Sequence, residues 1–302
     1  MNNNTKTLIA VVGPTASGKT AVGIELAKAL NTVIISADSR QFYREMAIGT
    51  AKPTPAELAQ AKHYFVDSHS IHDNFNVGGF EQEGLQLLNE LFKTHDVVVM
   101  VGGSGLYVKA ITEGFDDLPA TDPAIRERLN AELADHGISY LQEKLKAADP
   151  VYYEQVDLNN PQRIIRALEV YEATGQPFSS FRKSAQKKRD FEVLKLGVSM
   201  PREVLYNRIN LRVDEMAKQG LVDEVRALLP YRHLNALQTV GYTEIFDYLD
   251  GTTDLPTAIE LIKQNTRRFA KRQMTWFNRD KEVIWLAPDE FLPEVKKRYP
   301  RL

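Results

Sequence analysis

The stretch Gly13-Pro14-Thr15-Ala16-Ser17-Gly18-Lys19-Thr20 fits the phosphate-binding loop pattern G-x-x-x-x-G-K-[ST] at every required position. The two glycines let the backbone wrap its N–H groups around a pair of phosphates, and Lys19 supplies a positive charge for the outer one. The Thr20 hydroxyl is the ligand that such a loop offers to Mg²⁺. The stretch therefore predicts an oligophosphate site, with Mg²⁺ as cofactor and Thr20 as its protein ligand.

The residues on both sides of this loop match the strand and helix that it requires. Residues 8–12 form an apolar run typical of a buried strand, and residues 22–30 carry one apolar helical stripe. Apolar runs recur at residues 33–35 and 97–101, and residues 194–198 alternate like a returning strand. We therefore expect an α/β fold with a P-loop NTPase-like parallel sheet flanked by helices.

The composition of the whole chain is that of a globular protein. Its 302 residues, 43% of them hydrophobic, are enough for a sizeable core. Cysteine is absent, which excludes disulfides and thiolate metal sites. No apolar segment resembles a signal peptide or a membrane span, so we expect a cytoplasmic protein without a membrane partner; no obligate protein partner is evident. Because the formal net charge is -2, any RNA binding would depend on local patches.

The character of the chain changes between residues 116 and 190. This stretch reads as charged, amphipathic helices separated by prolines, with no convincing strand. Within it, Asn160 and Pro161 predict the start of a helix and Gly175 its end. We expect an all-helical insertion domain at 116–190, set into a catalytic core formed by 1–115 and 191–302.

Two polar side chains follow apolar strands at the sheet edge where open α/β folds bind ligands. Asp38 follows the strand at 33–35, and Ser104 lies in the Gly-rich turn after the strand at 97–101. An aspartate in an Asx-turn and a serine that caps a helix are the structural alternatives for these residues. An edge shared with Lys19 favours the functional interpretation of Asp38.

Several basic stretches have both a functional and a structural interpretation. Arg208 and Arg212 lie four residues apart on a predicted helix, a spacing that suits a lid over a phosphate but is also common on surfaces. Residues 182–189 carry five positive charges without an acid, and residues 263–281 carry seven with one acid. Each stretch either contacts a phosphate backbone or is a solvated basic surface.

Two negative signals also enter the prediction. P-loop ATPases usually hold Mg²⁺ with an aspartate at the end of a strand, whereas the nearest acid here, Asp96, precedes its strand. This position disfavours ATP hydrolysis. Pro53 and Pro55 predict that the surrounding segment is loop without helix.

Seven motifs, taken in chain order, resemble the bacterial tRNA dimethylallyltransferase family, also called the tRNA isopentenyltransferase or IPP transferase family. They are Gly13-Pro14-Thr15-Ala16-Ser17-Gly18-Lys19-Thr20, Ser36-Ala37-Asp38-Ser39, Gly49-Thr50-Ala51-Lys52-Pro53, Val101-Gly102-Gly103-Ser104-Gly105-Leu106-Tyr107, Asn160-Pro161-Gln162-Arg163, Val240-Gly241-Tyr242 and Lys271-Arg272-Gln273. A generic P-loop kinase would not reproduce the motifs that follow the loop.

The resemblance implies transfer of a dimethylallyl group from dimethylallyl diphosphate to N6 of the adenosine just 3′ of the tRNA anticodon, with Mg²⁺ and release of diphosphate. A P-loop without a Walker B acid then holds a leaving group rather than a nucleotide to be hydrolysed. The anticodon stem-loop is the implied partner of the helical insertion. Eukaryotic members add a zinc finger, which the absence of cysteine excludes here.

The resemblance also assigns roles to individual residues by motif. It implies Asp38 as general base and Ser104 as a second catalytic residue, where many members carry threonine. The implied diphosphate ligands are Gly13, Pro14, Thr15, Ala16, Ser17, Gly18, Lys19, Thr20, Arg208 and Arg212, with the main arginine left open. The implied tRNA-contacting residues are Asp38, Ser39, Arg40, Gln41, Ser104, Arg126, Gln162, Arg163, Ile164, Ile165, Arg166, Gly241, Lys271 and Arg272.

Two other classes of function compete with this interpretation. A small-molecule P-loop kinase, or a prenyltransferase acting on free adenylate, needs the phosphate site but no RNA surface. A non-catalytic RNA-binding module needs the basic patches alone.

Overall fold

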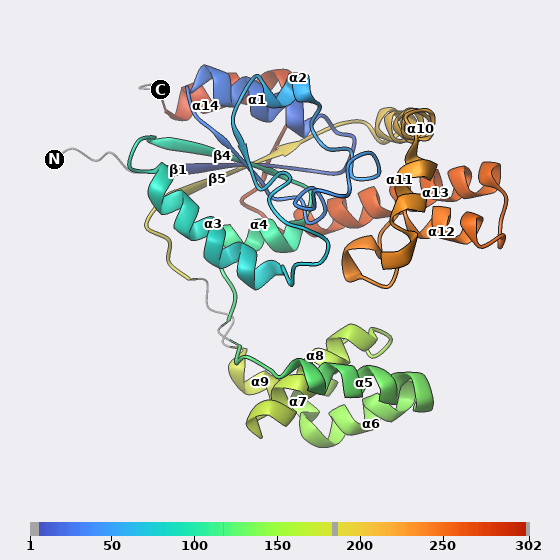
Figure 1. Ribbon diagram of the computed structural model, residues 1–302. Coiled ribbons are helices and arrows are strands. Elements are labelled where there is room, and N and C mark those ends of the chain that lie inside the picture. The colour runs from blue at the N-terminus through green and yellow to red at the C-terminus, as the bar shows by residue number, and fades with distance from the viewer. Residues whose placement is uncertain (1–5, 117, 183–186, 300–302) are drawn as a thin grey trace. The chain divides into compact units, whose positions relative to one another are not determined.

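The computed structural model describes residues 6–116, 118–182 and 187–299 (Figure 1). The chain divides into one compact unit of Met1–Glu113 with Arg189–Leu302 and a second of Gly114–Lys188. This division falls two residues before the boundaries expected at 116 and 190. The first unit contains the phosphate-binding loop.

A six-stranded sheet forms the centre of the first unit, in the order β3-β2-β4-β1-β5-β6. Its strands are β1 (Thr7–Val12), β2 (Ile34–Ser36), β3 (His63–Tyr64), β4 (Val97–Gly102), β5 (Glu192–Val198) and β6 (Ile284–Leu286). Every pairing is parallel. Val12 lies opposite Gly102, and Ser36 opposite Val101, so the segments that follow β1, β2 and β4 leave the same edge. This sheet confirms the predicted α/β class.

Alternation along β1 produces a hydrophobic core on each face of the sheet. Leu8, Ala10 and Val12 join the core under α3 (Val77–Leu91) and α4 (Gly105–Thr112). Ile9 and Val11 join the core under α1 (Lys19–Ala29) and α14 (Phe291–Arg298). Figure 1 shows these helix pairs on opposite sides of the strands. Because β1 is central and covered on both faces, the loop that follows it is held on a rigid support.

A group of helices beside the carboxyl edge of the sheet completes the first unit. It contains α10 (Arg202–Lys218), α11 (Leu221–Ala227), α12 (Thr243–Leu249) and α13 (Leu255–Phe277), with single turns at Leu229–Tyr231 and Asn235–Leu237. A separate core of Val213, Leu221, Tyr242 and Ile262 joins them to the segment around Met46. This core positions α10 and α13 beside the phosphate-binding loop.

Helices are the only regular secondary structure among the residues that the structure describes in the second unit. Its helices are α5 (Pro123–His136), α6 (Ile138–Ala148), α7 (Pro150–Tyr153), α8 (Pro161–Thr174) and α9 (Phe178–Phe181). Asn160 caps α8 by accepting a hydrogen bond from the Arg163 N–H, and Gly175 ends it at φ 70°. Both helix signals act as the sequence predicted.

One local prediction is wrong. Pro53 and Pro55 were expected to exclude helix, yet the short helix α2 (Pro55–Leu58) begins at Pro55. Thr54 caps it, with Glu57 completing a reciprocal capping box. Proline is favoured at the first helical position because the N–H that it lacks has no helical partner there.

Within the described residues, no helix combines the length and the apolar composition that a membrane span requires.

Candidate active site

The phosphate-binding loop forms an anion cradle from backbone N–H groups. Gly13, Ala16 and Gly18 have positive φ values of 143°, 63° and 96°. Such values bend the backbone so that successive N–H groups point into one concave site. Gly18 is the N-cap of α1, and the N–H groups of Lys19 and Thr20 have no hydrogen-bond partner among the described residues. The positive end of the 11-residue helix therefore points at the cradle.

Three cations face this cradle. Burial lowers the pKa of Lys19 to about 8, although Asp38 opposes the shift, and Arg212 adds to it. Burial and the neighbouring Arg208 lower the pKa of Arg212. A Cβ built on Gly18 would lie 3.5 Å from Nη2 of Arg208, so this guanidinium lies over the loop. Because these cations repel one another, a bound polyanion would stabilise their charged forms.

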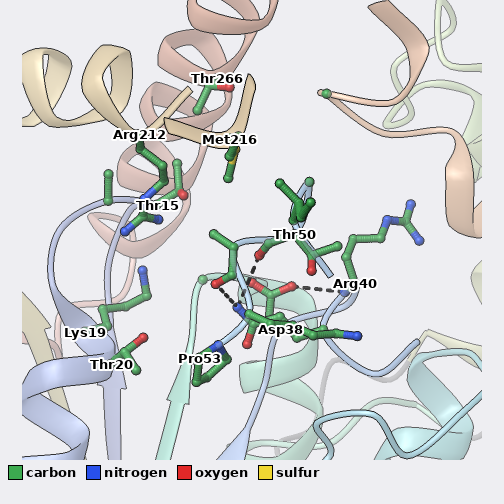
Figure 2. Close-up of a pocket in the computed structure, with 18 of the residues that line it drawn as sticks. Thr15, Lys19, Thr20, Asp38, Arg40, Thr50, Pro53, Arg212, Met216 and Thr266 are labelled. Atoms are coloured by element: carbon green, nitrogen blue, oxygen red, sulfur yellow. Dashed lines mark hydrogen bonds between the residues drawn. The ribbon is translucent and has the colours of Figure 1, made fainter. Parts of the chain in front are cut away.

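Asp38 lies at the same cavity, and its two carboxylate oxygens have different surroundings. Its Oδ1 accepts a hydrogen bond from the Arg40 N–H at 3.0 Å, which is the Asx-turn contact. Its second carboxylate oxygen has no protein partner among the described residues, and the side chain lines the pocket. Figure 2 shows Asp38 across the cavity from Lys19 and Arg212. One carboxylate oxygen thus holds the turn while the other stays available for chemistry.

Ser104 connects two loops instead of capping a helix. It occupies the N-cap position of α4, but its side chain makes no capping hydrogen bond. Its Oγ instead accepts from the Ser39 N–H at 2.9 Å and lies 3.2 Å from the Ser39 hydroxyl. Ser104 is therefore the N-cap residue of α4, as the structural alternative predicted, but its side chain does not cap the helix. Ser104 holds the residue next to Asp38.

Glu224 was missed by the sequence analysis and organises the segment on the opposite wall. Its carboxylate accepts hydrogen bonds from the N–H groups of Ala47, Ile48 and Gly49 at 3.0, 2.7 and 3.0 Å. It also accepts from the buried Tyr242 hydroxyl at 2.7 Å, and burial followed by the charge of Glu224 raises the pKa of Tyr242. No local motif marks a single acid on a short helix, so the sequence carried no signal for it.

These elements enclose a cavity of about 580 Å³. Lys19 and Arg212 lie beside the cradle, and Asp38 lies across the cavity from them (Figure 2). Apolar side chains contribute to the wall: Val213, Met216, Val240, Ile262 and Phe269. In Figure 2, Met216 lies between Arg212 and Thr50. The cavity therefore offers an anion site, an apolar wall and a carboxylate in one space.

The residues expected to contact tRNA are divided between the two units. Asp38, Ser39, Arg40, Gln41, Ser104 and Gly241 line the cavity. Lys271 and Arg272 are exposed on α13 and are not part of the cavity wall, with the Arg272 guanidinium 5.8 Å from the Phe269 ring centroid. Cavity and helix surface are thus distinct places within the first unit.

In the second unit, three of the predicted residues, Arg126, Gln162 and Arg166, are linked around the buried Glu169. Arg126 pairs with the buried Glu169 through two hydrogen bonds of 2.7 and 2.8 Å, and Arg166 lies 3.6 Å from the same carboxylate. Arg126 also donates to Gln162 at 3.2 Å. Gln162 and Arg163 are exposed. Arg126 and Arg166 therefore have structural partners as well as partly exposed side chains.

Two of the predicted tRNA contacts need correction. Ile164 and Ile165 have fully buried side chains in the core of the second unit. A side chain packed among Leu129, Leu141 and Leu168 cannot face RNA. The helical period explains why neighbouring residues differ in exposure. Ile164 and Ile165 lie on the inner face of α8, whereas Gln162 and Arg163 lie on its outer face.

The described residues of the basic stretch at 182–189 have different surroundings. Residues 183–186 lie outside the described part of the chain. Arg182 is exposed and lies 5.3 Å from the Tyr152 ring centroid. Arg189 donates to the carbonyls of Ile111 and Ala110 at 2.9 and 2.5 Å and pairs with Glu81. Arg189 thus caps the end of α4, so neither of the two interpretations, a phosphate contact or a solvated basic surface, describes this residue.

The acidic residues agree with the absence of a Walker B aspartate. Asp96 lies before β4 and pairs with Lys6 at 2.8 Å, at the sheet edge opposite the loop. Across residues 6–116, 118–182 and 187–299, no group of three His, Cys, Asp or Glu side chains is arranged to hold a metal. Thr20 lines the cavity beside Lys19. The Thr20 hydroxyl is therefore a group that could bind a cation at the loop.

Known proteins resemble this chain over nearly its whole length. The family model described as IPP transferase matches residues 41–280. The tRNA dimethylallyltransferase of Christiangramia forsetii is 54% identical over 283 residues, and that of Cytophaga hutchinsonii 53% over 285, each with 94% of both chains covered.

Solved structures agree with these relatives. The tRNA isopentenylpyrophosphate transferase from Bacillus halodurans superposes with a TM-score of 0.71 at 38% identity, covering 98% of this chain and 96% of that one. A eukaryotic dimethylallyltransferase acting on tRNA gives 0.77 at 25% identity, covering 94% and 74%. The chain therefore belongs to the IPP transferase family, the family of the tRNA dimethylallyltransferase enzymes.

Proposed function

We propose that this protein transfers the dimethylallyl group of dimethylallyl diphosphate to N6 of the adenosine just 3′ of the tRNA anticodon and releases diphosphate. The observation that carries the proposal is that one cavity joins an anion cradle to a carboxylate oxygen without a partner among the described residues, along a partly apolar wall. A prenyl diphosphate needs the anion cradle for its diphosphate and the apolar wall for its prenyl group. An amine nucleophile needs the carboxylate oxygen.

The diphosphate would bind at the loop. N–H groups from Gly18 to Thr20 would donate to its oxygens, while Lys19, Arg208 and Arg212 balance its charge. As the bond between the prenyl carbon and the diphosphate oxygen breaks, negative charge builds up on that oxygen. Donors that are already oriented stabilise this charge without reorganisation. The five-carbon group fits beside Met216 and Val213, which present no polar atom apart from a thioether.

Asp38 would act on the nucleophile. The lone pair of N6 is delocalised into the purine ring, so a proton has to leave as the new carbon–nitrogen bond forms. The carboxylate oxygen of Asp38 that has no protein partner would accept this proton. The products are the N6-prenylated adenosine, free diphosphate and a protonated Asp38 that returns its proton to water.

Mg²⁺ fits the residues at the loop. Magnesium commonly takes one or two protein oxygens and completes its shell with phosphate oxygens and water, and the Thr20 hydroxyl beside the cradle suits this pattern. When bound, the ion would neutralise charge on the leaving diphosphate. Asp38, Glu57 and Glu215 line the cavity, but no three such side chains among the described residues are arranged to hold a metal, which favours a cation that arrives with the substrate.

The relatives support tRNA as the acceptor, since their names specify tRNA. On this chain, exposed Lys271 and Arg272 on α13, and Gln162 and Arg163 on α8, would contact the anticodon stem-loop. An adenosine would have to leave the stacked loop to reach the cavity. A cytoplasmic location and the lack of an obligate protein partner stay predictions.

The test is transfer of a labelled prenyl group. Purified protein is incubated with labelled dimethylallyl diphosphate, Mg²⁺ and unmodified tRNA, and the tRNA is digested to nucleosides. We expect label in one modified adenosine. Parallel reactions with AMP and with ATP test the two rivals: label on AMP identifies a free-adenylate prenyltransferase, and ATP turnover without prenyl transfer identifies a kinase.

A further inference from the structure

One amide side chain joins the two loops on which the proposed reaction depends. Gln273 lies on α13, is 6% exposed and lines the cavity. Its Oε1 accepts a hydrogen bond from the Thr15 N–H at 2.8 Å, and its Nε2 donates to the Gly103 carbonyl at 2.9 Å. Thr15 belongs to the phosphate-binding loop, and Gly103 to the turn between β4 and α4.

The chemistry of the two contacts determines how the amide is oriented. A backbone N–H can only donate and a carbonyl can only accept, so one orientation of the amide satisfies both. A carboxylate in this place would lose the donor, and an aliphatic side chain would lose both partners. The Thr15 N–H is also withdrawn from the anion cradle, because Gln273 already occupies it.

The turn at Gly103 is shaped to receive this side chain. A Cβ built on Gly103 would lie 2.4 Å from Nε2 of Gln273 and 3.3 Å from the carbonyl oxygen of Gly13. The first distance is shorter than real Cβ contacts. A glycine is therefore required for the amide to reach the carbonyl, and the two loops lie directly against each other here.

The same turn continues to the base. Ser104 follows Gly103 and accepts from the N–H of Ser39, which follows Asp38. We propose that Gln273 is a positioning residue that sets the separation between the leaving diphosphate, held by the phosphate-binding loop, and the proton acceptor Asp38. The inference rests on the proposed function and goes beyond it, since Gln273 itself touches neither reacting atom.

Gln273→Met tests the proposal because it keeps the length of the side chain and removes both hydrogen bonds. We expect the single-turnover rate at saturating donor and tRNA to fall about 10- to 100-fold, the effect of misplacing reacting groups by about 1 Å. The dissociation constants of donor and tRNA should change less than about threefold, because the cradle and the RNA surfaces remain. Gln264→Met, on an exposed position of the same helix, is the matched control and should match the wild type.

Gln273→Glu adds a second measurement, the pH dependence of the transfer rate, which a purely structural role of Gln273 would not change. Ionised, the glutamate accepts from Thr15 but faces the Gly103 carbonyl with a second acceptor. Protonated, its O–H can donate to Gly103 as the amide did. The ratio of variant to wild-type rate should therefore rise as the pH is lowered, and taking this ratio removes the pH dependence that the two enzymes share.

The outcomes separate the possibilities. A normal rate for Gln273→Met, or a loss confined to donor affinity, overturns the positioning role. If Gln273→Met does not fold, a pH-independent ratio for Gln273→Glu overturns it. A wild-type enzyme that transfers no prenyl group to tRNA contradicts the proposed function instead, before any variant is compared.

Discussion

Glu224 accepts a hydrogen bond from the backbone N–H of Gly49 at 3.0 Å, although 175 residues separate them in the chain. The same carboxylate binds the two preceding N–H groups and the Tyr242 hydroxyl. A Cβ on Gly49 would lie 2.5 Å from the Tyr242 ring, so the segment and the aromatic side chain are in close contact. One wall of the cavity is therefore held by a single half-buried carboxylate.

Replacing this acceptor should weaken both the segment and the enzyme. Glu224→Gln turns an NH₂ group toward N–H donors and removes the charge that strengthens these bonds. We expect a loss of about 1–3 kcal/mol in the free energy of unfolding and a fall in kcat/KM, measured by denaturant unfolding and by prenyl transfer. Asp223→Asn, exposed on the same helix, is the control. Equal stability of the two variants would contradict this account.

The pKa of Lys19 predicts how donor binding depends on pH. Because burial lowers this pKa to about 8 in the free protein, the amine loses its proton as the pH rises through that value. Only the protonated form attracts diphosphate, so donor affinity should decrease above about pH 8. Lys19→Arg stays charged and should bind with a flatter profile, while Lys19→Met binds weakly at every pH.

Calorimetric titration of the donor between pH 6.5 and pH 9.5, a range about 1.5 units on either side of the Lys19 pKa, measures this dependence. The donor itself ionises in the same way in both titrations, so comparison with the arginine variant removes its contribution to the pH dependence of the affinity. A wild-type profile parallel to that of Lys19→Met would show that the lysine charge does not contribute.

Asp38→Asn tests the base. Asparagine retains the oxygen that accepts from the Arg40 N–H, so the turn should persist, but it cannot take a proton. We expect the single-turnover rate to fall about 10²- to 10⁴-fold, with donor and tRNA affinities changed less than about tenfold. A normal rate combined with a collapse of tRNA affinity would make Asp38 a residue that recognises RNA.

The buried Lys195 should be important for folding. It is 4% exposed and lies 2.7, 2.6 and 3.0 Å from the carboxylates of Glu113, Asp280 and Glu282, which raise its pKa above the usual value. Lys195→Met leaves these carboxylates unbalanced and should cost about 2–4 kcal/mol, discounted because Glu282 is exposed. Lys93→Met removes an exposed pair with Glu90 and should cost less than about 1 kcal/mol in the same unfolding measurement.

The exposed pair Lys271 and Arg272 tests the RNA surface. Replacing both with glutamine should weaken tRNA binding and reduce the slope of log affinity against log salt by about one for each charge. Lys296 and Lys297, an adjacent exposed pair on α14, provide a matched control with the same charge change. Equal slopes for the two double variants would place the RNA contact elsewhere. Transfer at saturating tRNA should recover for the Lys271 and Arg272 variant, since phosphate contacts position without reacting.

The sequence alone determined the parts of this protein that depend on local pattern. Apolar runs ending in Gly-rich or acidic turns identified the parallel strands, and parallel strands place their carboxyl ends at one edge. The cradle at residues 13–20, Asp38 and Ser104 were therefore predictable as neighbours of one cavity. The start and end of α8 were predictable for the same reason, because Asn160 and Gly175 act on their own backbone.

Only the tertiary structure decided which side chains join these parts. Glu224 reaches Gly49, Gln273 reaches Thr15 and Gly103, and Arg189 caps α4 instead of extending a basic patch. Each outcome depends on which residues the packing of distant helices brings within hydrogen-bond or van der Waals distance. Such contacts have no period or spacing in the chain, because the partner lies tens to hundreds of residues away.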